Sequence, residues 1–493
     1  MIRYFLGLTI LLFAAFMQSS CRKEAFNESP TAVLNFSVDT VYFDTVFTTL
    51  GSVTKRFLVH NKGNQPVKIS NISLGGGQGS AFRLNIDGIP GNSAKDVEIA
   101  SNDSIFIFAE VTINPNNELN PFVVLDSIRF ELNGNQQKVM LMAYGRNARF
   151  YRPTTFPKNG FPAYSVAECD AHWTKEMPVV IIGYLAVDSA CKLTIDAGTQ
   201  VYLYNNSGIW VYKNGAIEVN GTKEDTVVFQ GVRKEDVYKQ IAGQWDRIWI
   251  NQGHATNKIN YAVIKNGNIG IQAEYVPELG TGPLGGSLEL TNTRIRNMKA
   301  FGIYGVNYKM NVAYNNIISN CGTYALALIG GAYNFRHNTI ANYWTGSVRT
   351  EPSVYLSNGK MNADKTITPY PLEFRFRNGI VYGNKQDGNE LEVGKIDDNG
   401  VAFDWKFERS LLRLNNEEIS QDNPEHFSEM QFNNDPEFQD VFEQLYSLKE
   451  SSPARNFGNP AFVNSFPPIP EDILGNNRLG DQEPDLGAIE FKP

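Results

Sequence analysis

Residues 315–343, NNIISNCGTYALALIGGAYNFRHNTIANY, contain one short phrase twice. The phrase Asn-x-Ile-x-Asn begins at Asn316 and begins again 22 residues later at Asn338. A repeat of this length that carries short strands can bury its apolar positions only by stacking on its neighbours. The repeat therefore predicts a solenoid in which each copy forms one coil.

Related phrases at residues 261–266 and 292–297 align with these two copies without gaps, which makes four copies. A fifth copy at residues 377–382 follows a longer interval, and insertions near 274–286 and 349–368 account for the uneven spacing. In a stack of coils, equivalent residues lie about 4.8 Å apart. One inward-facing column is therefore expected to comprise Ile264, Ile295, Ile318, Ile340 and Ile380.

Asparagine is expected at the bends of the coils. Its amide can donate to one neighbouring coil and accept from the other, which satisfies polar groups where the strand ladder is interrupted. One such column is predicted at Ala262, Thr293, Asn316, Asn338 and Asn378, and another at Asn266, Asn297, Asn320 and Asn342.

These columns resemble the right-handed parallel β-helix of the pectin-lyase-like superfamily. The resemblance covers about residues 192–384, and we place the β-helix at 151–432. Phrases such as Asp472-Ile-Leu-Gly-Asn-Asn-Arg478 and Pro484-Asp-Leu-Gly-Ala-Ile-Glu490 resemble the closing segment of exported bacterial β-helix proteins. Because a solenoid end must hide its open sheet edges, residues 433–493 are expected to form a C-terminal cap.

Residues 33–150 have a different pattern. Period-two alternation, as in residues 67–72, is broken by turn signals, and Asn133-Gly134 joins two such runs as a hairpin. Many short strands over this length favour an immunoglobulin-like β-sandwich. The fold class is therefore all-β, with an N-terminal Ig-like β-sandwich followed by a right-handed parallel β-helix and its cap.

The N-terminus has the pattern of an export signal. Arg3 precedes an apolar run at residues 4–17, which is too short to span a bilayer comfortably. Gln18-Ser19-Ser20-Cys21 resembles the lipobox of bacterial lipoproteins, which implies a signal peptide at 1–21, a lipid on Cys21 and a tether at 22–32. A plain secretory signal is the alternative. The resemblance implies export and anchoring to the bacterial outer membrane, facing the periplasm or the surface.

Three other cysteines follow Cys21. Cys169 and Cys191 are 22 residues apart, the same interval as the repeat, so they can lie on adjacent coils and form a disulfide. Cys321 would then be left over. Three buried free thiols are the alternative that the sequence leaves open.

Basic residues gather on the outward side of the predicted coils. Alternation across a strand places Lys265 beside Arg296 on the next coil, with Arg294 on the same strand. In lyases of the resembled superfamily a Lys or Arg removes the α-proton of a uronic acid, and adjacent cations lower the pKa of such a base. These three residues are the candidate catalytic group, with Ca²⁺ as a possible cofactor in that case. A structural role on a solvated face is the alternative.

A further outward column is a candidate for binding. It comprises Tyr261, Asn292, Asn315, His337 and Arg377. Rings on the early coils, among them Trp210, Trp245 and Trp249, are a second candidate, since outward rings can stack on sugars; core packing is their commoner use. No metal site is predicted, because the acidic loops near residues 387–400 lack EF-hand spacing.

Two functions remain in competition at this level. The first is a non-catalytic surface lipoprotein whose β-helix face binds a polysaccharide or cell-surface glycan. The second is a polysaccharide lyase acting on an acidic, uronate-containing glycan by β-elimination. A nucleic-acid partner is not expected, because the formal net charge is −8 and no basic domain stands out.

Overall fold

The computed structural model describes residues 25–116, 121–158, 160–277, 286–396, 400–415, 417–480 and 483–492. The predicted signal peptide, Cys21 and the first residues of the predicted tether lie outside these ranges. The chain divides into two compact units, Met1–Asn147 and Ala148–Pro493. Within the described ranges, no helix has the length and apolar character needed to cross a membrane.

The first unit is a β-sandwich of two five-stranded sheets, as the alternating pattern predicted. Inward residues of both sheets, such as Val59, Ile107 and Phe130, form its core. One sheet contains, in spatial order, β1 (Asn35–Phe36), β3 (Lys55–Asn61), β8 (Asp103–Val111), β5 (Phe82–Ile86) and β6 (Ile89–Pro90). The other contains β2 (Thr40–Phe47), β10 (Asn135–Arg146), β9 (Phe122–Leu132), β4 (Val67–Leu74) and β7 (Ser93–Ile99).

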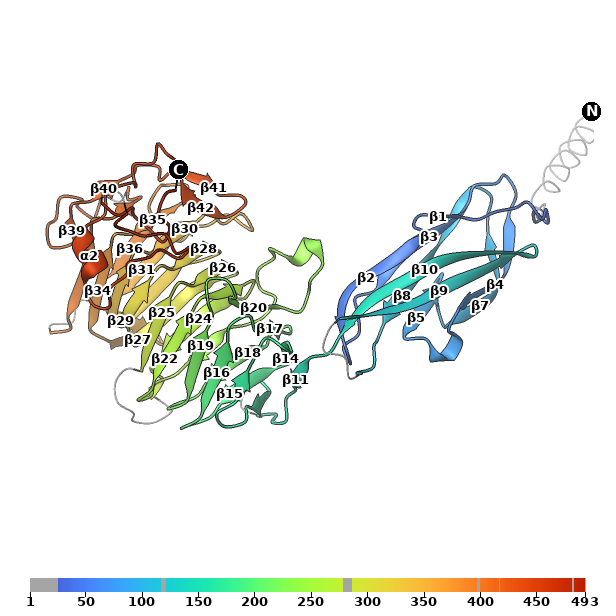
Figure 1. Ribbon diagram of the computed structural model, residues 1–493, viewed down its shortest axis with the longest axis horizontal. Helices are drawn as coiled ribbons and strands as arrows, with labels where there is room; N and C mark the ends of the chain where they lie inside the picture. The colour runs from blue at the N-terminus through green and yellow to red at the C-terminus, as the bar shows by residue number, and fades with distance from the viewer. Residues whose placement is uncertain are drawn as a thin grey trace, which may run out of the picture. The chain divides into compact units, whose positions relative to one another are not determined.

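The second unit is a parallel β-helix, visible in Figure 1 as successive strands stacked side by side. An eleven-stranded parallel sheet forms one side, called sheet A here. Its strands are β11 (Arg149–Tyr151), β14 (Val179–Ile181), β17 (Gln200–Leu203), β20 (Val227–Gly231), β23 (Ala262–Lys265), β26 (Arg294–Met298), β28 (Ile317–Cys321), β30 (Thr339–Asn342), β35 (Ile380–Gly383), β38 (Leu411–Leu412) and β40 (Gln431–Phe432).

The remaining strands of the coils form two further sides, which join where the long strands β27 (Phe301–Tyr314) and β29 (Leu326–Arg336) contribute to both. Sheet B contains their first halves with β12 (Tyr164–Val166), β15 (Tyr184–Val187), β18 (Gly208–Val211), β21 (Ile248–Ile250), β24 (Ile269–Glu274), β31 (Val354–Ser357) and β36 (Leu391–Gly394). Sheet C contains their second halves with β13 (His172–Trp173), β16 (Lys192–Asp196), β19 (Ala216–Asn220), β22 (Thr256–Asn260), β25 (Ser287–Thr291), β34 (Leu372–Arg377), β37 (Phe403–Glu408) and β39 (Phe427–Ser428).

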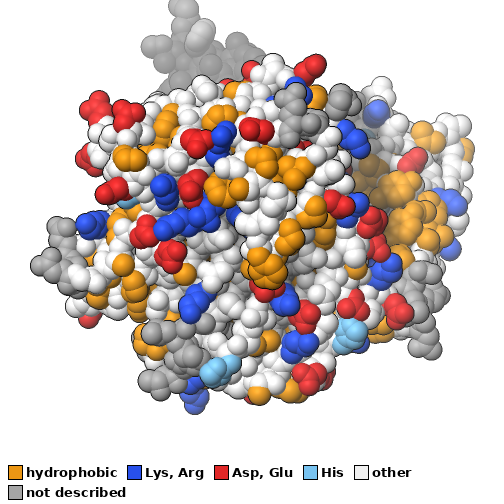
Figure 2. All heavy atoms as spheres, turned by 60° about the vertical axis from the view of Figure 1, so that its left-hand side comes forward, with side chains coloured by type: hydrophobic (Ala, Val, Ile, Leu, Met, Phe, Trp, Pro, Cys, Tyr) orange, Lys and Arg blue, Asp and Glu red, His pale blue; other side chains and the backbone are white. Residues whose placement is uncertain are grey.

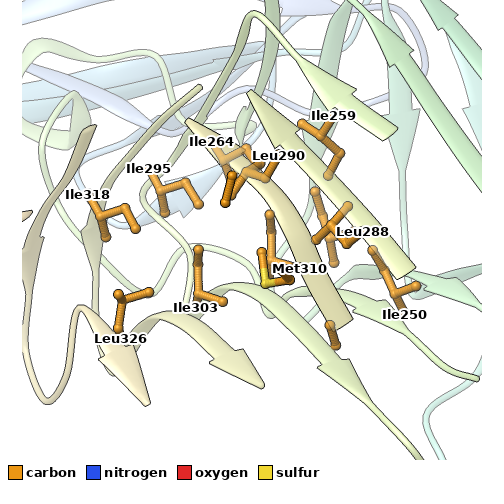
Figure 3. Close-up of a cluster of buried hydrophobic side chains, with 14 of the residues drawn as sticks. Ile250, Ile259, Ile264, Leu288, Leu290, Ile295, Ile303, Met310, Ile318 and Leu326 are labelled. Carbon is orange, nitrogen blue, oxygen red and sulfur yellow. The ribbon is translucent and has the colours of Figure 1, made fainter. Parts of the chain in front are cut away.

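The predicted isoleucine column is confirmed over four coils. Ile264 pairs with Ile295, Ile295 with Ile318, and Ile318 with Ile340. All four are fully buried, and Figure 3 shows the first three in a row facing the residues of the other two sheets.

The prediction for the fifth member of that column, Ile380, is wrong by one residue. Ile340 pairs with Val381, and Ile380 instead pairs with Thr339 and faces outward. The cause is the bend, because Asn378 takes the left-handed conformation (φ 49°) that His337 takes on the preceding coil (φ 52°). Arg377 therefore lies at the end of β34 and pairs with Arg336 in sheet C, not with His337.

The C-terminal segment, predicted as an end cap, packs on the outward side of sheet A. Its hairpin, β41 (Phe438–Asp440) and β42 (Leu445–Leu448), and the residues up to 490 pack in one hydrophobic cluster with outward side chains of sheet A. The short helix α2 (Pro460–Asn464) belongs to the same segment, which Figure 1 draws in red beside β28, β30 and β35. The outward side of sheet A is thus largely an internal surface of the protein.

Candidate functional site

Two segments cover the outward side of sheet A from its two ends. Over the early coils, residues 232–243 fold back on the sheet, where Asn266 Nδ2 donates to the carbonyl oxygen of Lys239 at 3.0 Å. Over the later coils, the C-terminal segment is held by hydrogen bonds such as that from the Ala488 N–H to Thr339 Oγ1 at 2.9 Å. Among the described residues, β23 and β26 form the strip that lies between these two coverings, with Asn266 contacting the first and Arg296 contacting Gln444 of the second.

The predicted catalytic residues all lie on this strip, in the register that was expected. Lys265 pairs with Arg296, and Arg294 pairs with Val263. Each of the three side chains is partly exposed. We call Lys265, Arg294 and Arg296 the cationic cluster.

The cationic cluster is electrostatically unfavourable as it stands. Burial, followed by the charges of Arg296 and Lys239, lowers the pKa of Lys265. Burial also lowers the pKa of Arg294 and of Arg296. A lowered pKa is what a general base needs at Lys265. However, no described carboxylate forms an ion pair with Lys265 that could help to orient a substrate there.

Four of the five predicted binding residues form one column at the bend between sheets C and A. Tyr261, Asn292, Asn315 and His337 all have positive φ, between 47° and 56°. Asparagine adopts this conformation more readily than other side chains, which explains why it recurs there. Asn315 Nδ2 donates to Asn292 Oδ1 at 2.9 Å, so part of the column is a ladder of side-chain amides.

The C-terminal segment covers the later part of that column. Arg478 Nη2 donates to Asn315 Oδ1 at 2.7 Å, and Asn315 Nδ2 also donates to the carbonyl oxygen of Glu471 at 2.9 Å. His337 is fully buried, and its Nε2 accepts from Asn378 Nδ2 at 3.0 Å. These contacts use the polar atoms that a glycan would need, so the geometry favours a structural role for Asn315 and His337.

Asp472, Arg478 and Asp485 lie in the same covered region. Arg478 is fully buried and forms an ion pair with Glu490. Asp472 Oδ2 accepts from the backbone N–H of Glu490 at 2.8 Å, and Asp485 Oδ1 accepts from that of Asn456 at 2.8 Å. These groups hold the C-terminal segment together and attach it to the coils.

Arg377, the fifth predicted binding residue, lies apart from the other four. Its Nε forms an ion pair with Glu408 Oε2 at 2.7 Å on the next strand of sheet C, and its Nη1 donates to Asn334 Oδ1 at 3.1 Å. The guanidinium thus bridges three adjacent coils.

The cysteines Cys169 and Cys191 form a disulfide, with their Cα atoms 4.8 Å apart. They immediately precede the paired strands β13 and β16, so the bond joins two adjacent coils near the start of the β-helix. Cys321 is free and fully buried, and burial raises the pKa of its thiol to about 12. Such a thiol is a packing residue rather than a nucleophile.

The most distinctive outward feature lies on sheet B, where the sequence analysis pointed only to individual rings. One outward position carries a large or polar side chain on most coils from β18 to β36. In pairing order its residues are Trp210, Trp249, Gln272, Tyr304, Ala327, Tyr355 and Glu392. We call this column, with the adjacent rings of Phe301 and Tyr324, the aromatic face.

Rings on the aromatic face stack on one another. Trp210 and Trp249 are nearly parallel, with centroids 5.3 Å apart and an interplanar angle of 13°. Tyr324 lies 6.0 Å from Phe301 and 5.4 Å from Tyr355. All of these side chains are partly exposed, so their ring faces or edges reach solvent. Trp245, by contrast, is fully buried and belongs to the core.

Polar groups fix the orientation of the central residues of this face. Glu274 Oε1 accepts from Trp249 Nε1 at 2.8 Å and from Gln272 Nε2 at 2.7 Å. Lys360, on the hairpin of β32 (Gly359–Met361) and β33 (Ile367–Pro369), lies 3.9 Å from Glu274 Oε2. Burial and the charge of Glu274 raise the pKa of Tyr304 to about 12, so its hydroxyl keeps its proton and can donate a hydrogen bond.

Acidic groups gather at the far end of the aromatic face. Tyr324 OH donates to Glu351 Oε2 at 3.0 Å. Burial, then the charge of Glu351, raises the pKa of Glu392. The segment that carries Glu351 is anchored by a buried ion pair between Arg349 and Glu390, with Nη2 and Oε1 2.6 Å apart. Among the described residues no group of three or more His, Cys, Asp or Glu side chains could hold a metal ion.

No protein-family model matches the chain, and no curated protein matches it. Several solved structures match parts of it. The ASH/PapD-like domain of human CEP192 is 11% identical, with a TM-score of 0.19, over 27% of this chain and 97% of that one. A family 123 glycoside hydrolase from Clostridium perfringens is 10% identical over 23% of this chain and 26% of that one, with a TM-score of 0.17.

The alkylpurine DNA glycosylase AlkC of Pseudomonas fluorescens is 10% identical, with a TM-score of 0.15, over 27% of this chain and 33% of that one. At such TM-scores these similarities establish neither a family nor a function for this chain.

Proposed function

We propose that this protein is an exported, lipid-anchored glycan-binding protein whose aromatic face is the binding surface. The observation that carries the proposal is the register of the face, which places Trp210, Trp249 and Tyr304 at one outward position along the stack. Successive coils are about 4.8 Å apart, so an extended chain can lie along the column and contact ring after ring.

The chemistry of the face suits a sugar better than a protein or a lipid. Sugar rings combine apolar C–H faces with hydroxyls, and they need flat rings with nearby amides and carboxylates. In the register of the sheet Gln272 lies between Trp249 and Tyr304, and Glu274 accepts hydrogen bonds from Trp249 and Gln272. The phenol of Tyr304 stays protonated. Partly exposed Tyr and Trp provide contact area at low cost in side-chain entropy.

The experiment is a binding screen of the full chain against neutral and acidic polysaccharides, followed by titration of the best ligand. Trp249→Ala is expected to weaken binding at least tenfold, and Tyr304→Phe to weaken it less, because it removes only the hydroxyl. Tyr204→Ala is the matched control, since Tyr204 is 44% exposed and lies outside the aromatic face. Equal binding by wild type and Trp249→Ala would refute this surface.

The lyase alternative, with Lys265 as base and Ca²⁺ as a possible cofactor, stays a prediction. It is supported by the lowered pKa of Lys265. Incubation with uronate-containing polysaccharides, monitored by the absorbance of the unsaturated product, separates it from binding alone. A broad panel without absorbance change, with binding retained, would refute the lyase.

Membership of the pectin-lyase-like superfamily and lipidation of Cys21 are parts of the same proposal. The former is supported by the parallel coils and the asparagine bends, and the latter by the sequence alone. Labelling with a radioactive fatty acid should mark the wild type and fail to mark Cys21→Ser. Labelling of both proteins would refute the anchor.

A further inference from the structure

The cationic cluster has no ion-pair partner within the described part of the chain, although the charge of Asp472 acts on Arg294. Elsewhere on the coils, basic side chains pair with acids on neighbouring strands, as in Lys192–Glu218 at 2.9 Å, and Figure 2 shows acidic and basic side chains intermixed on one face. Lys265, Arg294 and Arg296 form no ion pair with any described carboxylate. Partly buried cations without partners are costly, and an anion from solution would offset that cost.

Hydrogen bonding in the cluster is also incomplete. Arg296 Nε is buried without a hydrogen-bond partner, and Arg296 Nη1 makes one long contact, 3.4 Å, with Gln444 Oε1. A guanidinium carries five N–H donors, and paired donors on such a group match the oxygens of a sulfate or phosphate.

A pocket of about 490 Å³ lies over the ends of β26 and β28, and its lining includes Gln444, the residue that contacts Arg296. Its walls come from three segments, residues 240–243, 343–346 and 441–444. Its floor includes Asn297, which follows Arg296 in β26, and Asn320 on the next coil. The volume lies within the range of small-ligand sites.

The lining of this pocket combines rings, amides and one cation. Trp344 and Phe442 supply partly or largely exposed rings, Phe442 being 80% exposed. Asn320 Oδ1 is buried without a hydrogen-bond partner, so it can accept from a hydroxyl of a ligand. Lys299 is the only charged residue among the described lining residues.

Gln444 connects the pocket to the cationic cluster. Its Nε2 donates to Asn297 Oδ1 at 2.9 Å, while its Oε1 accepts the long bond from Arg296. A ligand oxygen can replace the weak contact to Arg296 without disturbing the stronger one to Asn297.

We propose that this pocket is a second binding site, for a sugar residue that carries a sulfate or phosphate ester. The ester oxygens replace Gln444 on Arg296, near Lys265, and the sugar ring lies against Trp344 with its hydroxyls on Asn320 and Lys299. The site is on sheet A, whereas the aromatic face is on sheet B. It therefore goes beyond the proposed function and does not depend on it.

The test is calorimetric titration of the full chain with N-acetylglucosamine 6-sulfate, N-acetylglucosamine 6-phosphate and unmodified N-acetylglucosamine. We expect at least one ester to bind ten or more times more tightly than the unmodified sugar, and affinity to fall with added salt. The two ester arms decide whether sulfate or phosphate is preferred. No saturable binding of either ester at millimolar concentration would overturn the proposal.

Variants locate the site. Arg296→Gln and Trp344→Ala are each expected to weaken ester binding at least tenfold. Lys309→Gln, which removes an exposed cation on β27, should leave it unchanged. If circular dichroism shows that Arg296→Gln does not fold, the variants Trp344→Ala and Phe442→Ala test the location of the site instead. Ester binding that survives both changes would also overturn the proposal.

Discussion

The amide of Asn316 is expected to be among the most important single groups for the stability of the β-helix. Asn316 is fully buried. Its Oδ1 accepts from the backbone N–H of Thr293 at 3.0 Å, and its Nδ2 donates to the carbonyl oxygen of Leu290 at 2.8 Å. Replacement by alanine removes both bonds but keeps the bond from the Asn316 N–H to Asn338 Oδ1.

The magnitude follows from the groups left behind. Asn316→Ala leaves the backbone N–H of Thr293 buried without a partner and removes one bond to the carbonyl oxygen of Leu290, which is also paired within its sheet. The unpaired donor costs about 1–3 kcal/mol and the lost bond about 0.5–1.5 kcal/mol, so the free energy of unfolding should fall by roughly 1.5–4.5 kcal/mol. That is a large fraction of the net stability of an ordinary domain, about 5–15 kcal/mol.

The assay is guanidinium unfolding of the second unit within the full chain, followed by tryptophan fluorescence and by circular dichroism. Asn205→Ala is the matched control, because Asn205 is exposed; its effect should stay within about 0.5 kcal/mol. A loss below about 1 kcal/mol for Asn316→Ala, with an unchanged dependence on denaturant, would show that the amide ladder does not stabilise the coils as argued.

Three further predictions concern the same unit. Ile318→Ala, in the middle of the inward column, should cost about 2–5 kcal/mol by creating a cavity, and a loss under 1 kcal/mol in the same assay would contradict the packing. Burial lowers the pKa of His337 well below its usual 6.5, so below about pH 6.5 only the unfolded chain binds that proton. As the pH falls below this value, His337 should lower the free energy of unfolding by about 1.4 kcal/mol per pH unit. His337→Asn should remove that part of the slope between pH 7.5 and 5.5, and an unchanged slope would contradict the assignment. Cys191→Ser should cost about 2–4 kcal/mol, and reductant should lower the melting temperature of the wild type but not of the variant.

The backbone path of the β-helix could be predicted because the repeat is local and dense. Each copy places an isoleucine inward three residues after the bend, and four copies fall into one buried column. The prediction failed at the fifth copy because Arg377-Asn-Gly-Ile can be aligned in two ways. Only the left-handed bend at Asn378 decides that Val381, not Ile380, faces the core.

The aromatic face could not be predicted as a unit, because its members have no constant spacing. Trp210, Trp249, Gln272, Tyr304 and Tyr355 follow one another at intervals of 39, 23, 32 and 51 residues. Insertions of different length separate the strands, so the alignment of these side chains depends on the sheet register and not on a repeat in the chain.

The sequence by itself determined the all-β class, the stacked coils and the neighbours Lys265 and Arg296. Tertiary structure alone decided what covers those coils. The described residues of the C-terminal segment lie over the outward side of sheet A because apolar side chains there, such as Ile317 and Ile380, pack against apolar side chains of the segment. Hydrophobic burial is non-directional. A local sequence pattern therefore identifies an apolar side chain but does not predict which surface will cover it.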